Sequence, residues 1–309
     1  MYKINWRKIY RVLRKFEGRN SHMTKPLVLS IQSGVSHGRC GNRSAVPAIE
    51  MSGIDCDPIN TVNFSTNTAY PVVKGTKLHQ DQLHDLIEGL RLNNILSEYT
   101  HMLTGYVGDP NIIKELASLR KELGSNVCYF CDPVLGDNGR FYVSQECLEL
   151  IKTVLVPVAQ IISPNAYEAE WLTGLKMTNQ AELLKIVSKL HELGPETVVI
   201  TSTEWKRSFV FFSFEKGQIQ FAIELVRFDR KFNGPGDLFA ALFLANNIRF
   251  PKQYKKIAIR TVNSVYGVLK TTVDLNSREL AIPSSVSSIL YPADNFKIIP
   301  LEDFMQIEI

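Results

Sequence analysis

The sequence predicts an α/β protein with a doubly wound, mostly parallel central sheet covered by helices on both faces. Short apolar runs of strand type alternate with segments that repeat apolar residues at helical spacing, and only a few residues connect them. This alternation is typical of parallel strands joined by crossover helices. The 309 residues are 45% hydrophobic, which suffices for the core of a three-layer sandwich.

Six apolar runs are expected to form the parallel part of the sheet. They cover residues 27–33, 54–64, 99–106, 126–133, 159–165 and 197–203. In order along the chain, helices are expected at residues 42–53, 80–93, 111–124, 145–155, 166–174 and 180–194. After Thr203 the pattern changes to an antiparallel strand pair within 208–228, a helix from Asp237 and a long helix over 252–274. The last thirty or so residues show no clear pattern.

The charge distribution separates a basic extension, residues 1–25, from a single domain, residues 26–309. The extension holds eight Lys/Arg and one Glu, which leaves 27 basic against 30 acidic residues in the rest. The domain is therefore not a nucleic-acid binder by charge. The extension is expected to be disordered, with a mitochondrial presequence as the alternative, so we expect a cytoplasmic or mitochondrial protein. No run is long enough to span a membrane.

Five cysteines spread over a long chain indicate reduced thiols. Cys128 and Cys131 have C-x-x-C spacing but lie in a predicted strand, where positions three apart point to opposite faces. They are therefore not expected to bind a metal together.

Polar residues at the carboxyl ends of the predicted strands indicate the ligand site, because ligands of parallel sheets bind beyond those ends. We expect the following residues to converge on one crevice: Ser33, Tyr106, Asp132, Ser163–Asn165 and Thr201–Ser202.

The stretch "FNGPGDLFAALFLA", residues 232–245, indicates phosphate chemistry. Its glycines precede a helix, and the free N–H groups and dipole at a helix start attract anions. Asp237 in the first turn is either a catalytic group or a helix cap. The chain contains neither a P-loop nor the protein-kinase motif set.

Further acidic groups near this helix start indicate a divalent cation. Asp132, Asp137 and Glu168 would repel phosphates unless a cation such as Mg²⁺ lay between them. The alternative is that these acids cap turns or helices. Asn165 and Glu168 share one side of a first helical turn.

Eight motifs, taken together in this order, resemble the pyridoxal kinase family of the ribokinase superfamily. They are residues Ser30–Asn42, Val62–Tyr70, Glu88–Asn94, Leu103–Asp109, Tyr129–Asp137, Ile162–Gly174, Val198–Thr203 and Gly234–Ala245. The resemblance runs from about Leu27 to about Asp274. It implies a ribokinase-like fold and transfer of the ATP γ-phosphate to the 5′-hydroxymethyl group of pyridoxal, pyridoxine or pyridoxamine.

The resemblance also implies roles for individual residues. Asp237 matches the catalytic base, and Gly234, Pro235 and Gly236 match the anion hole. The vitamer pocket is matched by Ser33, Thr68, Tyr106 and Tyr142. ATP binding is matched by Asp132, Ser163, Asn165, Thr201, Ser202, Phe232, Gly234 and Gly236, and metal binding by Asp132, Asp137 and Glu168. K⁺ dependence, a homodimer and a loop over the nucleotide at residues 226–233 are implied by analogy.

One residue departs from the family pattern. The family has Gly-Thr-Gly-Asp where this chain has Gly234-Pro235-Gly236-Asp237, so a hydroxyl and a backbone N–H are missing from the anion hole. Two alternatives stay open, of which Pro235 prompts the second. The chain could be another ribokinase-like kinase, acting on hydroxymethylpyrimidine or a sugar, or a weakly active pseudokinase that binds vitamers.

Overall fold

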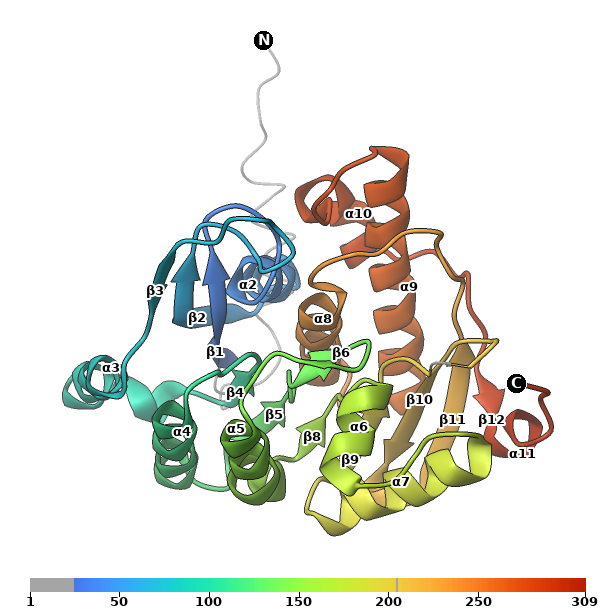
Figure 1. The fold of residues 1–309 in the computed structure, drawn as a ribbon, viewed down its shortest axis with the longest axis horizontal. Coiled ribbons are helices and arrows are strands. Elements are labelled where there is room, and N and C mark those ends of the chain that lie inside the picture. The colour runs from blue at the N-terminus through green and yellow to red at the C-terminus, as the bar shows by residue number, and fades with distance from the viewer. Residues whose placement is uncertain (1–24, 204) are drawn as a thin grey trace, which may run out of the picture.

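The computed structural model describes residues 25–203 and 205–309 of the chain. The predicted basic extension, apart from Lys25, lies outside the described residues. One sheet of ten strands crosses the molecule in the order β12-β11-β10-β9-β8-β5-β4-β1-β2-β3, with β3 and β12 at opposite edges (Figure 1).

The centre of the sheet is parallel and its edges are antiparallel, as expected for a doubly wound fold with an added hairpin. The parallel strands are β1 (Leu27–Val35), β2 (Asp55–Phe64), β4 (His101–Thr104), β5 (Cys128–Cys131), β8 (Ile161–Ile162) and β9 (Thr197–Ile200). The antiparallel strands are β3 (Gly75–Lys77), β10 (Phe209–Phe214), β11 (Ile219–Glu224) and β12 (Ile299–Pro300). All six predicted parallel strands and the predicted antiparallel pair are confirmed.

Helices cover both faces, which confirms the three-layer prediction. The helices are α2 (Asn42–Met51), α3 (Gln80–Leu92), α4 (Pro110–Leu123), α5 (Gln145–Leu150), α6 (Ala166–Thr173), α7 (Gln180–Glu192), α8 (Pro235–Arg249), α9 (Tyr254–Asp274), α10 (Val286–Leu290) and α11 (Leu301–Phe304). Side chains of α3 to α7 and α11 share one buried apolar cluster with one face of the sheet. Those of α2, α8, α9 and α10 share a second cluster with the other face.

The helix predicted over residues 145–155 is only partly regular. Its α-helical part ends at Leu150 and continues as a π-helical turn, Ile151–Leu155, and a 3₁₀ turn, Val156–Val158. Pro157 has no N–H to donate, so the regular hydrogen-bond ladder cannot continue through it.

The two strand cysteines point to opposite faces, as predicted. Cys131 is part of the cluster with α3 to α7, whereas Cys128 packs against the cluster with α8 and α9. All five cysteines, Cys40, Cys56, Cys128, Cys131 and Cys147, are free thiols.

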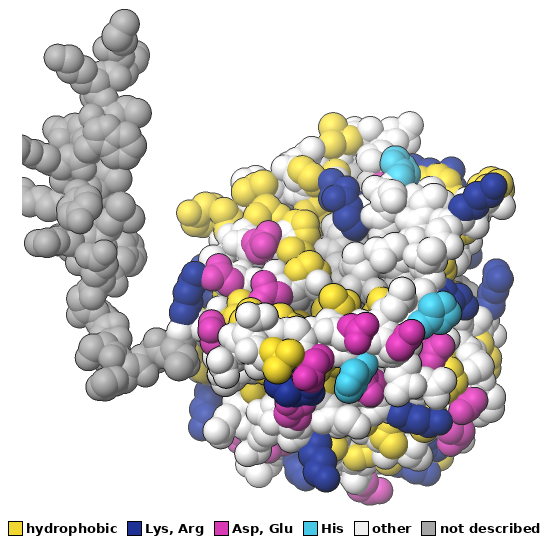
Figure 2. All heavy atoms as spheres, turned by 90° about the vertical axis from the view of Figure 1, so that its left-hand side faces the viewer, with side chains coloured by type: hydrophobic (Ala, Val, Ile, Leu, Met, Phe, Trp, Pro, Cys, Tyr) yellow, Lys and Arg dark blue, Asp and Glu magenta, His cyan; other side chains and the backbone are white. Residues whose placement is uncertain are grey.

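The surface beside α3 and β3 mixes acidic, basic and histidine side chains, and neither sign of charge dominates this face (Figure 2). Within residues 25–203 and 205–309, no helix is both long and apolar enough to cross a membrane.

Candidate functional site

The carboxyl ends of β5, β8 and β9 form one continuous polar rim. These strands are neighbours in the sheet, so the residues that follow them, Asp132, Ser163 and Thr201, lie along the same edge. The Ser163 hydroxyl donates to Oδ1 of Asp132 at 2.8 Å, and the Thr201 N–H donates to the carbonyl of Pro164 at 3.0 Å. Ser202 follows on this rim and is partly exposed.

Glu168 ties the start of α6 to the loop after β5. The Asn165 side chain accepts from the Glu168 N–H at 2.9 Å, and Oε2 of Glu168 accepts from the Asn165 N–H at 2.8 Å, which forms a capping box. Oε1 of Glu168 accepts from the N–H groups of Leu135 at 3.0 Å and Gly136 at 3.4 Å. Both oxygens of Glu168 thus hold backbone amides, so a large part of its role is structural.

The N-terminus of α8 lies against the turn that follows β1. Gly234 caps the helix with φ +82°, and a Cβ at this position would lie 2.0 Å from the Arg39 carbonyl oxygen. Only glycine allows both this backbone conformation and this approach. Pro235 occupies the first helical position, where its fixed φ suits the helix, and Asp237 lies in the first turn.

Asp237 is held on the side of α8 that faces β1. The Gly41 N–H donates a hydrogen bond to its carboxylate. Gly41 has φ +54°, and a Cβ there would lie 2.0 Å from the carbonyl oxygen of Ser33. Ser33 lies where the register between β1 and β2 shifts. Gly41 therefore contacts both Ser33 and Asp237.

The site gathers carboxyl groups of like charge. Burial raises the pKa of Asp237 to about 6, although the Gly41 hydrogen bond lowers it. Burial and the neighbouring Asp237 raise the pKa of Asp132 to about 7, against the lowering effect of the Ser163 bond. Burial and Asp132 together hold the pKa of Glu168 well above its ordinary value. Charge repulsion and desolvation on this scale favour a bound cation.

The three predicted metal ligands differ in their availability. Oδ2 of Asp132 has no hydrogen-bond partner among the described residues and can reach a cation. Asp137 lies in the hairpin of β6 (Gly136–Asp137) and β7 (Arg140–Phe141), where its oxygens accept from the Asn138 N–H and side-chain amide at 2.8 and 2.7 Å. In the described ranges, no group of three or more His, Cys, Asp or Glu side chains forms a metal cage.

The four predicted vitamer residues come from four separate segments of the chain. Ser33 contacts Gly41, and Tyr142 follows β7, where Asp137, Glu168 and Cys40 all influence its pKa. Thr68 is exposed on the loop between β2 and β3.

Tyr106 follows β4, which lies between β1 and β5 in the sheet. Its hydroxyl lies so close to Gly108 that a Cβ there would be 2.4 Å away, and the Cys147 thiol of α5 influences its pKa. The ring is therefore half-buried on the α5 side of the strand edge.

The loop before α8, residues 226–233, is fastened to the end of α9. Arg230 donates to the carbonyl of Ser277 at 2.7 Å, and its guanidinium lies 5.2 Å from the centroid of the Phe232 ring. Phe228 packs edge-on against Phe232, with ring centroids 5.6 Å apart. Gly236 has open space where a side chain would project.

Sequence reasoning missed the turn that holds Asp237. Gly41 and Arg39 fall inside a recognised motif, but their contacts with Asp237 and Gly234 join positions about 200 residues apart. Pro and Gly in "GPGD" indicate that a helix starts there, but they do not indicate which other segment of the chain the helix start contacts. The sequence also gave no indication that Glu279 accepts a hydrogen bond from the Arg39 N–H at 3.0 Å.

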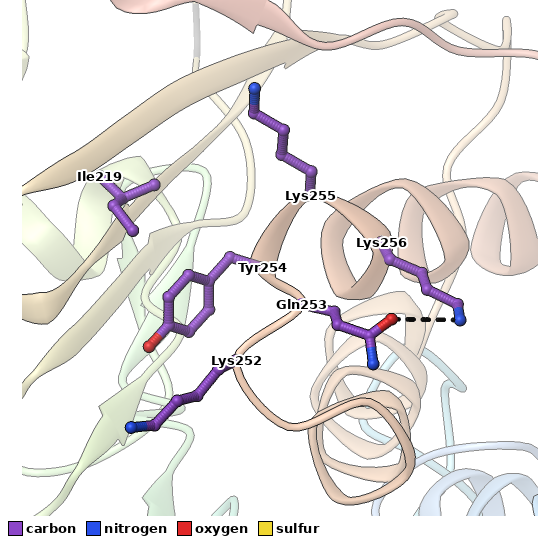
Figure 3. A pocket seen from close by; sticks show the side chains of 6 residues that line it. All are labelled: Ile219, Lys252, Gln253, Tyr254, Lys255 and Lys256. Carbon is purple, nitrogen blue, oxygen red and sulfur yellow. Dashed lines mark hydrogen bonds between the residues drawn. The ribbon is translucent and has the colours of Figure 1, made fainter.

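A pocket of about 380 Å³ lies between the start of β11 and the start of α9 (Figure 3). Its lining residues are Ile219, Lys252, Gln253, Tyr254, Lys255 and Lys256. None of the predicted site residues belongs to it.

Comparison with known proteins connects this geometry to one family. The phosphomethylpyrimidine kinase family matches residues 70–276. A pyridoxal kinase of Arabidopsis thaliana is 39% identical over 268 residues, which is 84% of this chain and 86% of that protein. The human pyridoxal kinase is 37% identical over 266 residues, which is 80% of this chain and 85% of that protein.

Solved structures give the same result. Pyridoxal kinase from Leishmania donovani in complex with ADP and pyridoxine has a TM-score of 0.83 and 30% identity, covering 89% of this chain and 99% of that one. Plasmodium falciparum PdxK with the ligands AMP-PNP and PL has a TM-score of 0.82 and 27% identity, covering 90% and 100%.

Replacing Gly234 by Ala should lower the free energy of unfolding by about 2 kcal/mol or more, because the left-handed backbone is strained and the new Cβ meets the Arg39 carbonyl. The matched change Gly236→Ala places its Cβ in open space and should leave stability unchanged or slightly raised. Urea unfolding of both variants measures the difference. Equal stabilities would contradict the proposed close contact.

Asp132→Asn should stabilise the protein at pH 8. A carboxyl whose pKa rises to about 7 on folding contributes stability at low pH that is lost as pH rises through 7, so its ionised form is costly at pH 8. We expect a gain of at least about 1 kcal/mol at pH 8 and none near pH 4. Asp85→Asn on the exposed face of α3 is the control. A gain that does not depend on pH would show that desolvation of Asp132 is not its cause.

Proposed function

The chain belongs to the pyridoxal kinase family, and on that basis we propose that it transfers the γ-phosphoryl group of ATP to the 5′-hydroxymethyl group of pyridoxal, pyridoxine or pyridoxamine. The observation that carries the proposal is the position of Asp237 at the start of α8, in contact with Gly41 and within electrostatic reach of Asp132. The likeness to pyridoxal kinase complexes with ADP and pyridoxine supports it.

Asp237 acts as the general base. Its pKa of about 6 leaves it ionised at neutral pH and close to the operating pH, which suits proton transfer. As the substrate oxygen attacks the γ-phosphorus, the hydroxyl proton passes to the Asp237 carboxylate. The new O–P bond forms while the bond from the phosphorus to the leaving oxygen of ADP breaks.

The start of α8 stabilises the transferring phosphoryl group. The amides of Gly236 and Asp237 lie in the first turn and have no partner within the helix, and the helix dipole adds a partial positive charge. Negative charge spread over the phosphoryl oxygens is stabilised by such donors. Pro235 supplies no N–H between the two glycines.

Asp132 and Glu168 fit a divalent cation such as Mg²⁺. Asp132 offers its free Oδ2, and a bound cation would favour the ionised form of the neighbouring Glu168, whose pKa burial and Asp132 raise. Mg²⁺ commonly binds through one or two carboxylates together with phosphate oxygens and waters, so a cage of three protein ligands is not required. When bound, the cation neutralises the phosphate charge that these carboxylates would otherwise repel.

The remaining rim residues bind the two substrates. Ser163, Asn165, Thr201, Ser202 and Phe232 surround ATP, and Asp137 orders the β6–β7 hairpin beside the cation. Ser33, Thr68, Tyr106 and Tyr142 contact the vitamer. The loop of residues 226–233 excludes water from the phosphoryl group.

Three further properties follow from the family resemblance and are part of the proposal. These are stimulation by K⁺, assembly into a homodimer and a cytoplasmic location, with mitochondria as the alternative if residues 1–25 act as a presequence. Sedimentation tests the dimer, and fusion of residues 1–25 to a reporter tests the location.

The test of the function is a coupled ATP-consumption assay with pyridoxal, with and without K⁺. Wild-type protein should consume ATP only when a vitamer is present, and Asp237→Asn should lower kcat by about a hundredfold or more, because Asn cannot accept the proton. Asp85→Asn should keep full activity. An Asp237→Asn enzyme as fast as wild type would refute the assignment of the base. A panel with hydroxymethylpyrimidine and sugars separates this function from the other ribokinase-like kinases.

Pro235→Thr should raise kcat, because it restores an N–H and a hydroxyl to the anion hole. The loss of one such donor costs about 10²–10³ in rate elsewhere. Single-turnover measurements with excess enzyme distinguish a slow wild-type kinase from a protein that only binds vitamers. A kcat that stays the same or falls would show that the missing donors do not limit the rate.

A further inference from the structure

One carboxylate outside the predicted site joins two of its loops. Glu279 lies beyond the end of α9, and its Oε2 accepts from the Arg39 N–H at 3.0 Å. Oε1 accepts from the Asn67 side-chain amide at 3.2 Å and from the Tyr70 hydroxyl at 2.9 Å. A single side chain therefore fastens the turn after β1 to the loop between β2 and β3.

Both fastened loops carry residues of the proposed site. The Arg39 carbonyl contacts Gly234, and two residues later the Gly41 N–H binds Asp237. Thr68 lies between Asn67 and Tyr70. Glu279 thus contacts Asn67, which is next to Thr68, and Arg39, which lies two residues before Gly41.

The surroundings of Glu279 are shaped for this contact. Gly38 has φ +114°, and a Cβ there would lie 2.9 Å from Oε2 of Glu279, so glycine allows the turn to approach the carboxylate. The Arg278 guanidinium lies 3.7 Å from the centroid of the Tyr70 ring and fixes the ring that donates to Glu279. Both Asp237 and Glu279 influence the pKa of the Cys40 thiol, which places Cys40 within reach of both carboxylates.

The same segment also holds the nucleotide side of the site. The Ser277 carbonyl accepts from Arg230 in the loop of residues 226–233, and the Ser277 hydroxyl donates to the Glu279 carbonyl at 2.6 Å. Residues 277–279 therefore contact loops on both sides of the cleft.

We propose that Glu279 is a positioning residue, which holds the Arg39–Gly41 turn against Gly234 so that the Gly41 N–H stays on Asp237. The inference rests on the proposed kinase function. Without this carboxylate, the turn loses its anchor, and a displacement of the base by about 1 Å is enough to lower the rate about a hundredfold. Glu279 does not touch the reacting atoms.

The experiment compares Glu279→Ala and Glu279→Gln with a matched control. Glu215 also accepts from a tyrosine hydroxyl, that of Tyr254 at 2.6 Å, but it lies near the amino end of β9, away from the site. We expect kcat with pyridoxal to fall about ten- to a hundredfold in Glu279→Ala, less in Glu279→Gln because its amide oxygen still accepts hydrogen bonds, and not at all in Glu215→Gln. The KM for ATP should change less than kcat.

A double-mutant cycle separates positioning from general stability. Tyr70→Phe should lower kcat in the wild-type background and have no further effect in Glu279→Ala, because its partner is already gone. Additive effects, or an unchanged kcat in a folded Glu279→Ala enzyme, would overturn the proposal. If Glu279→Ala does not fold, Tyr70→Phe and Glu279→Gln decide by the same criteria.

A second readout keeps this proposal distinct from the kinase function itself. If wild-type protein shows no vitamer-dependent ATP consumption, the proposed function fails. Amide hydrogen exchange at Arg39–Gly41 then tests the anchor alone. Faster exchange in Glu279→Ala than in Glu215→Gln would support it, and equal exchange would refute it.

Discussion

The close approach of the start of α8 to the turn after β1 is the constraint on which the site depends. It requires a glycine at position 234, where any side chain would meet the Arg39 carbonyl, and a glycine at position 41, where any side chain would meet Ser33. Because the two backbones touch, the Gly41 N–H reaches Asp237. The helix start, the base and the end of β1 are thereby held in one place, although they come from opposite ends of the chain.

Burying several carboxyl groups close together is electrostatically unfavourable, and this indicates the kind of ligand that the site binds. Burial raises the pKa of Asp132, Glu168 and Asp237, and a neighbouring carboxylate raises it further for Asp132 and Glu168. Glu168 is compensated by three backbone amides, whereas Asp132 keeps one oxygen free. If these carboxyl groups had only a structural role, the protein would be more stable without their charges. Their presence is consistent with a site that binds a cation together with phosphate groups.

The parts of the fold and site that could be predicted from the sequence are those that depend on local patterns. Apolar runs and helical spacing identified the six parallel strands, and the rule that strand ends form the ligand site brought Asp132, Ser163 and Thr201 to one rim. The parts that could not be predicted depend on contacts between distant residues. Glu279 and Arg39 are 240 positions apart, and no spacing rule joins them.

The shortest strands could not be predicted from the sequence for a different reason. The strands β3, β6, β7 and β12 are two or three residues long and carry no alternation that a pattern can detect. The hydrogen bonds from Asn138 to Asp137 in the β6–β7 hairpin depend on local side-chain geometry, which the position of Asp137 in the sequence does not indicate.

The most direct test of the central claim is a crystal structure of the protein with an ATP analogue and pyridoxine bound. The account predicts that a carboxylate oxygen of Asp237 lies within about 3.2 Å of the 5′-hydroxyl oxygen. It also predicts that the γ-phosphate lies at the first-turn amides of α8. A vitamer bound with this hydroxyl turned away from Asp237, or a γ-phosphate placed elsewhere, would contradict it.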